Sequence, residues 1–327
     1  METQTGILLI NLGSPSAPTE SAVREYLKAF LSDPCVVALP RFVWIPILHL
    51  FVLPFRSKKS SQKYAKIWME EGAPLSVHTI RQTKLLRGYL YKYGKGHLTV
   101  DYAMRYGSPG ILEQVKKLKD AGCKRIIAIP LYPQYAHSTT GTVKNILKQC
   151  QSILPIQYIN EYCTNPAYIT SLAESIHRHW KENGRAEKLL MSFHGLPQRV
   201  VDQGDPYQQQ CLKTAQLLAQ KLHLEDESWQ ISFQSRFGRA KWIQPYTQPT
   251  LESWAKTGVK SVDVICPGFA SDCLETLEEI NIECRTAFLE KGGQTFHYIP
   301  CLNEEDIWIR TLVQFVQTEL GKRHENA

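Results

Sequence analysis

A histidine stands at the end of a predicted strand. The apolar run Leu189–Phe193 is typical of a buried strand, and His194 follows it directly, ahead of the sharp turn Gly195–Pro197. Ligands of parallel α/β sheets bind beyond the carboxyl ends of the strands, so this imidazole is placed to meet a ligand. An imidazole titrates near neutrality and can accept a proton or bind a metal. A lone histidine is more often structural; the strand-end position favours a functional role.

Three acidic residues follow a second predicted strand, Val262–Cys266. Asp272, Glu275 and Glu279 are spaced three and four residues apart, which places their carboxylates on one face of an α-helix. Such a row is a path for a divalent cation. The structural alternative is a capping box made by Asp272 and Glu275, but a capping box does not explain Glu279, one turn further on.

Arginines and aromatic residues follow two other predicted strands. Arg105 and Tyr106 come after the run Leu98–Ala103, and Trp242 comes soon after the run Trp229–Phe233. Each of these residues is a weak indication alone. Together with the imidazole and the carboxylates they predict a cleft with aromatic walls, suited to a large flat ligand that carries carboxylates and to a metal cation.

The elements that must position these residues follow one repeated pattern, a short apolar run and then an amphipathic stretch. This alternation predicts an α/β fold with parallel sheets covered on both faces. Eight strands form either one barrel or two doubly wound halves of four strands. We favour two halves, residues 1–153 and 154–302, with the C-terminal helix 303–321 joining the first. The predicted strands are Gly6–Leu12, Leu98–Ala103, Arg125–Pro130, Ile156–Ile159, Leu189–Phe193, Trp229–Phe233, Val262–Cys266 and Phe296–Ile299.

Composition excludes several classes of protein. The 327 residues are 43% hydrophobic and 21% charged, as in soluble globular proteins. Nine dispersed cysteines without a CxxC pair indicate free thiols in a reducing compartment. The net charge of +7 is spread along the chain without a basic run interleaved with aromatics, so we expect no nucleic-acid partner. The N-terminus lacks the pattern of a secretory signal, and we expect a cytoplasmic protein.

The segment Val36–Phe55 breaks the alternating pattern. Its length approaches that of a membrane span, but three prolines and Arg41 interrupt it. It is either a pair of core helices or an exposed apolar lip that meets a membrane face or an apolar ligand. The basic residues Arg56, Lys58 and Lys59 that follow favour the lip, because they suit headgroups and carboxylates.

Several segments in order along nearly the whole chain resemble the ferrochelatase (protohaem ferro-lyase) family. The most specific is MSFHGLPQRVVDQGDPY around His194. The others are Leu9–Pro15, Leu131–Gly141, Phe233–Gly238 with Trp242–Thr247, and Pro267–Ile280. The resemblance implies two Rossmann-like halves around a porphyrin cleft, and insertion of Fe²⁺ into protoporphyrin IX, the final step of haem synthesis.

The resemblance also implies roles for single residues. His194 would accept pyrrole protons or bind the metal, and Glu275 would face it, with Asp272 and Glu279 extending an acidic path. Arg105, Tyr106 and Trp242 match cleft positions of the family, while Arg56, Lys59 and Tyr64 fall where the family contacts the porphyrin propionates.

The end of the chain and the apolar segment indicate the type of family member. No cysteine follows Cys301, so we expect a bacterial type without the C-terminal extension that holds a [2Fe-2S] cluster, and no required cofactor. The segment Val36–Phe55 resembles membrane-associated members that use protoporphyrin IX, which implies peripheral contact with the inner membrane face. We expect a monomer or a homodimer.

Three other functions are consistent with parts of the pattern. One is a chelatase for another tetrapyrrole, such as sirohydrochlorin with cobalt or iron. Another is a non-catalytic haem or porphyrin carrier, although a carrier needs no proton acceptor facing an acidic row. The third is a two-lobed solute-binding protein, which the missing secretory signal disfavours.

Overall fold

The computed structural model describes residues 4–238 and 240–322 and divides the chain into two compact units. Unit 1 holds the residues up to Tyr132, the segment His137–Asn160 and the residues from Glu304 onward. Unit 2 holds Pro133–Ala136 and Glu161–Asn303. Each unit contains one sheet of four strands, and all of the strand pairs are parallel. The predicted α/β fold with two parallel four-stranded sheets is therefore confirmed.

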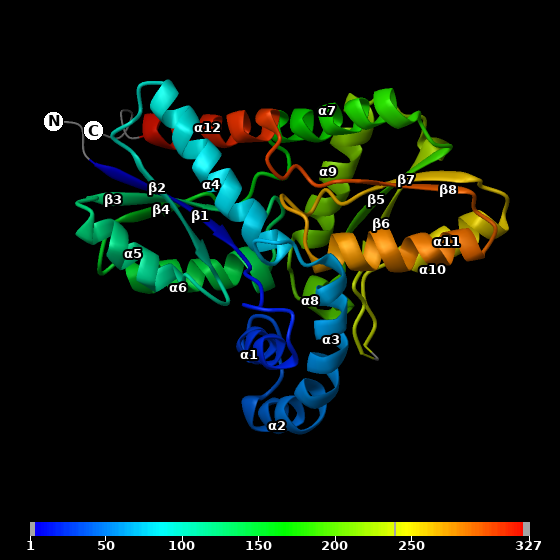
Figure 1. Ribbon diagram of the computed structural model, residues 1–327, viewed down its shortest axis with the longest axis horizontal. Helices are drawn as coiled ribbons and strands as arrows, with labels where there is room; N and C mark the ends of the chain where they lie inside the picture. Colours follow the sequence, from blue (N-terminus) through cyan, green and yellow to red (C-terminus); the bar gives the residue numbers. More distant parts are fainter. Residues whose placement is uncertain (1–3, 239, 323–327) are drawn as a thin grey trace. The chain divides into compact units, whose positions relative to one another are not determined.

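The sheet of unit 1 has the strand order β2-β1-β3-β4 (Figure 1). Every residue of the central strand β1 is buried, as expected for a parallel strand that is covered on both faces. From β1 the chain adds β2 on one side and then returns to add β3 on the other side. The carboxyl ends of β1 and β3 are therefore the topological switch point, where doubly wound sheets bind ligands. The strands are β1 (Thr5–Asn11), β2 (Thr99–Met104), β3 (Arg125–Pro130) and β4 (Ile156–Tyr158).

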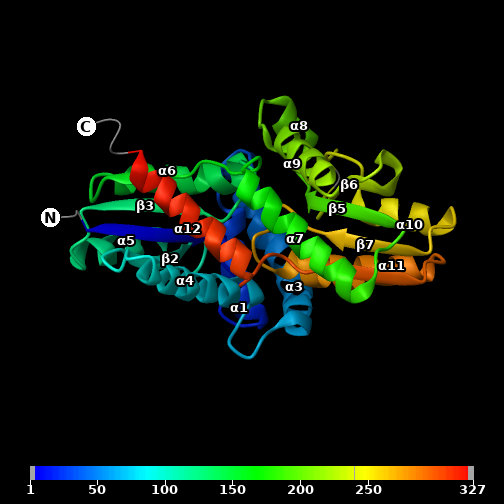
Figure 2. The same cartoon turned by 90° about the horizontal axis from the view of Figure 1, so that it is seen from above.

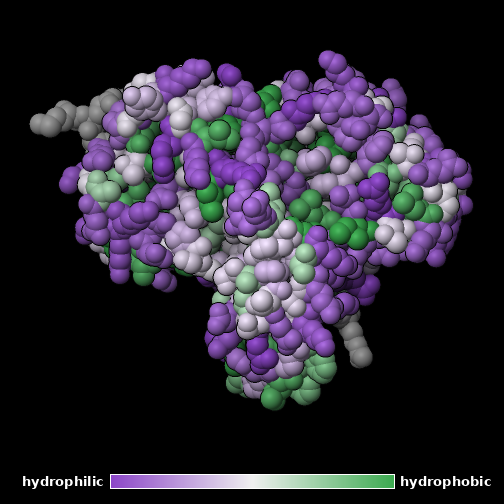
Figure 3. Space-filling view, viewed as in Figure 1, coloured by the Kyte–Doolittle hydropathy of each residue, from purple (hydrophilic) through white to green (hydrophobic). Residues whose placement is uncertain are grey.

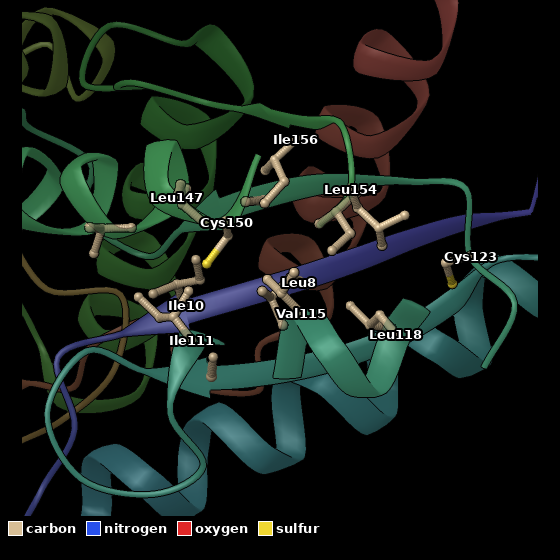
Figure 4. Packing of buried hydrophobic residues seen from close by; sticks show 14 residues of the cluster. Leu8, Ile10, Ile111, Val115, Leu118, Cys123, Leu147, Cys150, Leu154 and Ile156 are labelled. Carbon is tan, nitrogen blue, oxygen red and sulfur yellow. The ribbon is translucent and has the colours of Figure 1, made fainter. Parts of the chain in front are cut away.

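Helices cover both faces of this sheet (Figures 1 and 2). One face is covered by α4 (Pro74–Lys92) and α12 (Asp306–Gly321), and the other by α5 (Ile111–Asp120) and α6 (Thr142–Cys150), which follows the short π-helix η2 (His137–Gly141). Figure 4 shows the core on the second face, where Leu8 and Ile10 of β1 lie beside Ile111 and Val115 of α5. These contacts exclude water from the apolar faces of the helices.

The boundary between the units differs from the one proposed from sequence. A boundary at residue 153 would assign β4 to the second half, but β4 pairs with β3 inside the first sheet. The run Ile156–Tyr158 is a partly buried edge strand of unit 1, and the boundary in this segment follows Asn160. Helix α12 belongs to unit 1, where it packs against α4. Residues 323–327 of the tail lie outside the described residues.

The segment Val36–Phe55 carries an exposed apolar surface, which we call the apolar lip. It runs through α2 (Arg41–Ile47) and the π-helix η1 (Leu48–Val52) into α3 (Leu53–Ile67), which packs on α1 (Glu20–Leu31). Trp44, Leu48 and Leu53 are buried. Figure 3 shows hydrophobic surface at the tip of the projection that carries α2. The large apolar side chains exposed in this segment are Leu39, Phe42, Val43, Ile47, Leu50, Phe51 and Phe55. Within the described residues, no helix is both long enough and apolar enough to cross a bilayer.

The sheet of unit 2 repeats the topology of the first, with the strand order β6-β5-β7-β8. Its strands are β5 (Lys188–His194), β6 (Trp229–Gln234), β7 (Ser261–Ile265) and β8 (Thr295–Ile299). The helical elements are α7 (Pro166–Asn183), α8 (Gln198–Asp202), α9 (Tyr207–Lys221), η3 (Asp226–Ser228), α10 (Thr247–Lys256), the π-helix η4 (Glu275–Cys284) and α11 (Arg285–Glu290).

Two layers of helices enclose this second sheet. Helices α7 and α9 pack together on one side, and α10, η4 and α11 pack together on the other (Figure 1). The core on the α10 side contains Val262 and Val264 of β7, Leu251, Ile280 and Phe288. The switch point of this sheet lies at the carboxyl ends of β5 and β7, and His194 is the last residue of β5.

Candidate active site

His194 ends β5 with its ring in a defined orientation. Its side chain is partly buried, and Nδ1 lies 2.7 Å from the carbonyl oxygen of Gly195. Because a carbonyl oxygen only accepts hydrogen bonds, Nδ1 carries a proton, and in the neutral form of the ring Nε2 then keeps its lone pair. Nε2 can therefore accept a proton or bind a metal without a change of tautomer. The phenol of the buried Tyr207 makes a hydrogen bond with the backbone of His194 and supports this strand end.

The turn after His194 requires a glycine because other groups approach it closely. A Cβ atom at Gly195 would lie 2.8 Å from the Gln234 carbonyl oxygen and 3.1 Å from the Trp242 ring. The Gly195 amide donates to that same carbonyl oxygen, at 2.8 Å, and the Ile243 amide donates to the Leu196 carbonyl oxygen, at 2.9 Å. These contacts place Trp242 next to the residue that follows His194.

Glu275 opens the π-helix η4, beyond the end of β7. π-helices are rare and occur often at functional sites. The side-chain amide of Gln234 donates to the Glu275 carbonyl oxygen, at 2.8 Å, and Gln234 is the neighbour of His194 in the pairing of β6 with β5. One buried glutamine thus connects the strand end that carries His194 to the helix start that carries Glu275.

Glu279 is held by two hydrogen bonds from Ser235. The Ser235 amide and hydroxyl each lie 2.6 Å from a Glu279 carboxylate oxygen. Ser235 takes a φ of +65°, a strained value for a residue other than glycine, and such strain clusters at functional sites. Burial raises the pKa of Glu279 and the Glu275 charge adds to the rise, while the Ser235 hydrogen bonds and His194 oppose it. Glu279 therefore lies within electrostatic range of both His194 and Glu275.

Asp272 occupies a different environment from the one expected of an acidic path. It is buried, and its carboxylate accepts hydrogen bonds from Tyr298, from Thr276 at 3.0 Å and from Asn303 at 2.6 Å. It precedes η4 instead of lying one turn before Glu275 on a shared helix face. Its carboxylate anchors the start of η4 to β8 and the segment after it. Its part in an acidic path stays a prediction.

Arg105 and Tyr106, at the end of β2 in unit 1, join a buried network around Asp33. The Asp33 carboxylate accepts hydrogen bonds from Tyr106 at 2.8 Å, from Thr142 at 2.6 Å and from the Arg105 guanidinium. Burial opposes the ionised form of Asp33, but these hydrogen bonds outweigh it and lower its pKa. Burial raises the pKa of Tyr106 well above its ordinary value, so its hydroxyl stays protonated. The network orders the end of β2, where both residues were predicted to meet the ligand.

The three remaining residues predicted to bind substrate, Arg56, Lys59 and Tyr64, lie on α3, and Lys59 is exposed there. Arg56 is partly buried, and Tyr64 is 7% exposed with its ring edge-on to Trp68 at 6.1 Å between centroids. Tyr64 therefore contributes packing between α3 and the following loop. A contact of any of the three residues with a porphyrin stays a prediction.

Sequence reasoning did not find Gln234, Ser235 and Asp33. Gln234 and Ser235 stand at the end of a buried strand, the same signal that drew attention to His194. Asp33 gave no such signal, because it lies in the loop after α1 and meets Arg105 only through the tertiary fold.

The arrangement in unit 2 combines an imidazole, whose Nε2 atom takes no part in the hydrogen bond to Gly195, with two carboxylates at one end of a parallel sheet. Carboxylate oxygens and an imidazole nitrogen are suitable ligands for Fe²⁺ and related divalent ions. The same groups can accept protons, so the site can exchange a divalent cation for protons on a bound molecule.

Comparisons with known proteins identify the family to which this site belongs. The family model named Ferrochelatase matches residues 4–320. A ferrochelatase from Aromatoleum aromaticum is 55% identical over 97% of this chain and 88% of the relative. A ferrochelatase from Herminiimonas arsenicoxydans is 53% identical over 97% of this chain and 87% of the relative. The chain belongs to the ferrochelatase family.

Membership in the ferrochelatase family makes the chain a lyase of porphyrin and haem biosynthesis, an enzyme that inserts a metal into a porphyrin. Solved chelatases share its fold. SirB from Bacillus subtilis with Fe³⁺ aligns with a TM-score of 0.53 at 13% identity, over 96% of this chain and 95% of that one. CbiX, described as the terminal enzyme for biosynthesis of siroheme in denitrifying bacteria, aligns with a TM-score of 0.51 at 10% identity, over 96% and 98%.

Proposed function

We propose that this ferrochelatase inserts Fe²⁺ into protoporphyrin IX to form protohaem, the final step of haem biosynthesis, with His194 and Glu275 as the catalytic and metal-binding pair. The observation that carries the assignment is the tautomer of His194. Its Nδ1 proton is committed to the Gly195 carbonyl oxygen, so Nε2 is available at the sheet end where Glu275 and Glu279 also lie. Iron is a substrate here, and the proposal needs no resident cofactor.

The reaction exchanges two pyrrole protons for one Fe²⁺. A flat macrocycle keeps its nitrogen lone pairs in the ring plane, and bending it exposes them on one face. A site complementary to the bent ring therefore favours the transition state over the planar substrate. In the proposed mechanism His194 Nε2 accepts the two pyrrole protons one after the other and passes each to water, while Glu275 receives the hydrated iron and exchanges its water for carboxylate oxygens.

Glu279 extends this site because it can carry protons as well as charge. Burial and the nearby Glu275 charge raise the pKa of Glu279, so Glu279 holds its proton more readily than an isolated carboxylate does. Fe²⁺ arriving at Glu275 favours loss of that proton. The two carboxylates can thus balance the charge of bound Fe²⁺ and then release the ion to the porphyrin as the porphyrin becomes a dianion. We propose Asp272 as an anchor that fixes the start of η4 for this purpose.

The porphyrin itself meets aromatic and basic side chains in this proposal. Trp242, packed beside Gly195, supports the ring next to His194. Arg56, half-buried on α3, pairs with a propionate. Arg105 and Tyr106 shape their part of the site through the Asp33 network, and Tyr64 through its packing on Trp68.

The apolar lip supports protoporphyrin IX as the substrate and peripheral contact with a membrane face. Phe42 is 83% exposed, Phe55 is 75% exposed and Leu50 is 66% exposed, a concentration of apolar surface that marks a binding face on a soluble unit. Lys58 and Lys59 are exposed on the following helix, where they can meet lipid headgroups. Protoporphyrin is apolar and partitions into membranes, so such a face would give it access.

An anaerobic metallation assay tests the proposal. The full chain is mixed with Fe²⁺ and protoporphyrin, coproporphyrin or sirohydrochlorin in turn, and the Soret and Q bands are followed with and without liposomes. We expect metallation of protoporphyrin at the highest kcat/KM. Faster metallation of another tetrapyrrole would overturn the substrate assignment, and binding of protoporphyrin without metallation would indicate a carrier.

A variant of His194 tests the catalytic assignment separately. His194→Ala removes the proposed base and should lower kcat by about 10²–10⁴-fold, the usual contribution of a positioned general base, while porphyrin binding persists. His177→Ala changes an exposed histidine on α7 and serves as the matched control. Near-normal activity of His194→Ala would remove His194 from the reaction.

A further inference from the structure

A cluster of two histidines and one aspartate lies in unit 2 away from the proposed metallation site. His179 comes from α7, Asp263 from β7 and His297 from β8, and one ligand atom from each lies within 4.8 Å of the others. Asp263 and His297 are direct neighbours in the parallel pairing of β7 with β8. Helix α7 packs against β8 and brings the third residue to the pair.

Strand alternation places this cluster on the opposite face of the sheet from η4. Val262 and Val264 belong to the core on the side of α10, η4 and α11, so Asp263 between them points to the side of α7. Glu275 and Glu279 lie on η4, on the side of the sheet that α10 and α11 cover. The sheet therefore separates the cluster from the carboxylates proposed to handle iron.

Neighbouring donors orient the Asp263 carboxylate. Its Oδ2 atom accepts hydrogen bonds from Trp180 Nε1 at 2.7 Å and from the Ala186 amide at 3.1 Å. Its Oδ1 atom faces the histidines, 3.0 Å from His297 Nδ1 and 3.8 Å from His179 Nε2. Zn²⁺ ligands at about 2.0–2.1 Å in a tetrahedral arrangement are roughly 3.3 Å apart, between these two distances. Outer hydrogen bonds that fix one carboxylate oxygen are the usual support of a metal ligand.

The charge of Asp263 has no lysine or arginine partner in the part of the chain that the structure describes, and His297 Nδ1 makes the one histidine hydrogen bond to it there. The carboxylate is 1% exposed, and no lysine or arginine nitrogen in residues 4–238 or 240–322 lies within 4.0 Å of it. The buried His179 Nε2 atom makes no hydrogen bond there either. Buried charges are usually paired or bound to metals, and an unsatisfied buried nitrogen calls for a physical cause. A divalent cation between these atoms would satisfy both.

We propose that His179, Asp263 and His297 form a second metal site that binds Zn²⁺ or a similar borderline divalent cation, with a water molecule as fourth ligand. Two imidazoles and one carboxylate suit this class of ion better than Ca²⁺ or Mg²⁺, which prefer oxygen ligands. The side chain of His297 is 28% exposed, which provides an entry path and room for the water. The ion fastens α7 to β7 and β8.

The protons of the two imidazoles can rearrange to admit the ion. The exposed Asn183 amide lies 3.3 Å from His179 Nδ1, and rotating it lets its oxygen accept the Nδ1 proton once Nε2 is a ligand. His297 carries its proton on Nε2 when Nδ1 binds the ion.

Zinc binding is tested in the full chain with the proposed metallation site removed. The protein carrying His194→Ala and Glu275→Gln is dialysed against Zn²⁺ and the bound metal is measured by mass spectrometry. We expect one retained equivalent, lost when His297→Gln is added and kept when His177→Gln is added as the control on α7. Co²⁺ in the same site should show the visible bands of a four-coordinate ion.

Two results would overturn the proposal. One is a background protein that binds no zinc, and the other is retention of the bound zinc after His297→Gln. Thermal unfolding of the same background protein gives a second readout, in which zinc at about one hundred times its Kd should raise Tm by roughly 5 °C. The absence of this shift in the background protein, or the same shift after His297→Gln is added, would likewise refute the site.

Discussion

Ser235 donates two hydrogen bonds to the Glu279 carboxylate, so a single substitution at Ser235 should change the pKa of Glu279. Ser235→Ala removes the hydroxyl bond and keeps the amide bond, each of which is 2.6 Å long. Alanine and serine experience similar strain at a φ of +65°, so the substitution does not change the energetic cost of this backbone conformation. Glycine would relieve that strain and mix two effects. The alanine variant therefore isolates one hydrogen bond to a carboxylate.

The size of the effect follows from the charge on the acceptor. A hydrogen bond to a charged group contributes about 1.5–3 kcal/mol, which corresponds to a roughly tenfold to hundredfold change in the proton affinity of Glu279. The Ser235 bonds lower the Glu279 pKa while burial, the larger cause, raises it. Removing one of them raises this pKa further. If ionised Glu279 serves the reaction, the acidic limb of the pH profile must move to higher pH.

The assay is the pH dependence of kcat/KM for anaerobic iron insertion into protoporphyrin. On the acidic limb, Ser235→Ala should be roughly tenfold or more below wild type, and the two should converge at high pH, where Glu279 is ionised in both. Ser232→Ala is the matched control, because the buried Ser232 hydroxyl pairs with Thr247 at 2.9 Å and contacts no carboxylate. A Ser235→Ala profile that superimposes on wild type, in a protein of unchanged Tm, would refute the reasoning.

Three further predictions use other features of the two units. Gly195→Ala should destabilise the protein by about 1–3 kcal/mol in denaturant unfolding, because its Cβ would lie 2.8 Å from a carbonyl oxygen; Gly88→Ala, on a helix with nothing within 4 Å, should be neutral or stabilising. Burial raises the Glu279 pKa, so its contribution to stability is full below about pH 4.5 and is lost as pH rises through the raised value. Glu279→Gln should therefore raise Tm relative to wild type at neutral pH but not at pH 4, and a pH-independent difference would contradict this. Phe42→Ser should lower the affinity for anionic vesicles, measured by co-sedimentation, roughly tenfold, since burying one phenylalanine contributes about 1.5–3 kcal/mol. Tyr91, on α4, is 77% exposed and serves as the control; an equal loss of affinity in Tyr91→Ser would show that the apolar lip is not the membrane-binding surface.

The strands were predictable because burial on both faces leaves little choice of residue. In β1 every position is buried, and the sequence there is a nearly unbroken apolar run. Burial likewise made β5 and its end at His194 predictable, while the partly buried strands β2, β4, β6 and β8 were found from shorter apolar runs between helical stretches. The boundary between the units was less accessible. The short strand β4 follows a helix and a turn, as a first strand of a new unit would, and only its pairing with β3 assigns it to unit 1.

The surroundings of the candidate site depended on contacts that no local pattern encodes. Arg105 was expected at a ligand, but its guanidinium meets Asp33, which lies 72 residues earlier in the chain. Asp272 was placed on a helix face with Glu275 by assuming α-helical spacing throughout. Its actual partners Tyr298 and Asn303 lie beyond the helix, so the short-range spacing that suggested an acidic row could not show them.

The π-helix η4 explains why part of that row is kept. Its buried residues include Thr276, Ile280 and Cys284, which recur every four positions. Glu275 and Glu279 each precede one of these buried residues, so the two carboxylates run beside the buried stripe whether the turn is that of an α-helix or wider. Asp272 breaks the series because the π-helix begins only at Glu275. Where the start of a helix is uncertain, an i, i+4 pair is therefore a safer indication of neighbouring side chains than an i, i+3 pair. Here the i, i+4 pair is Glu275 and Glu279, and Glu279 hydrogen-bonds Ser235 and lies within electrostatic range of His194.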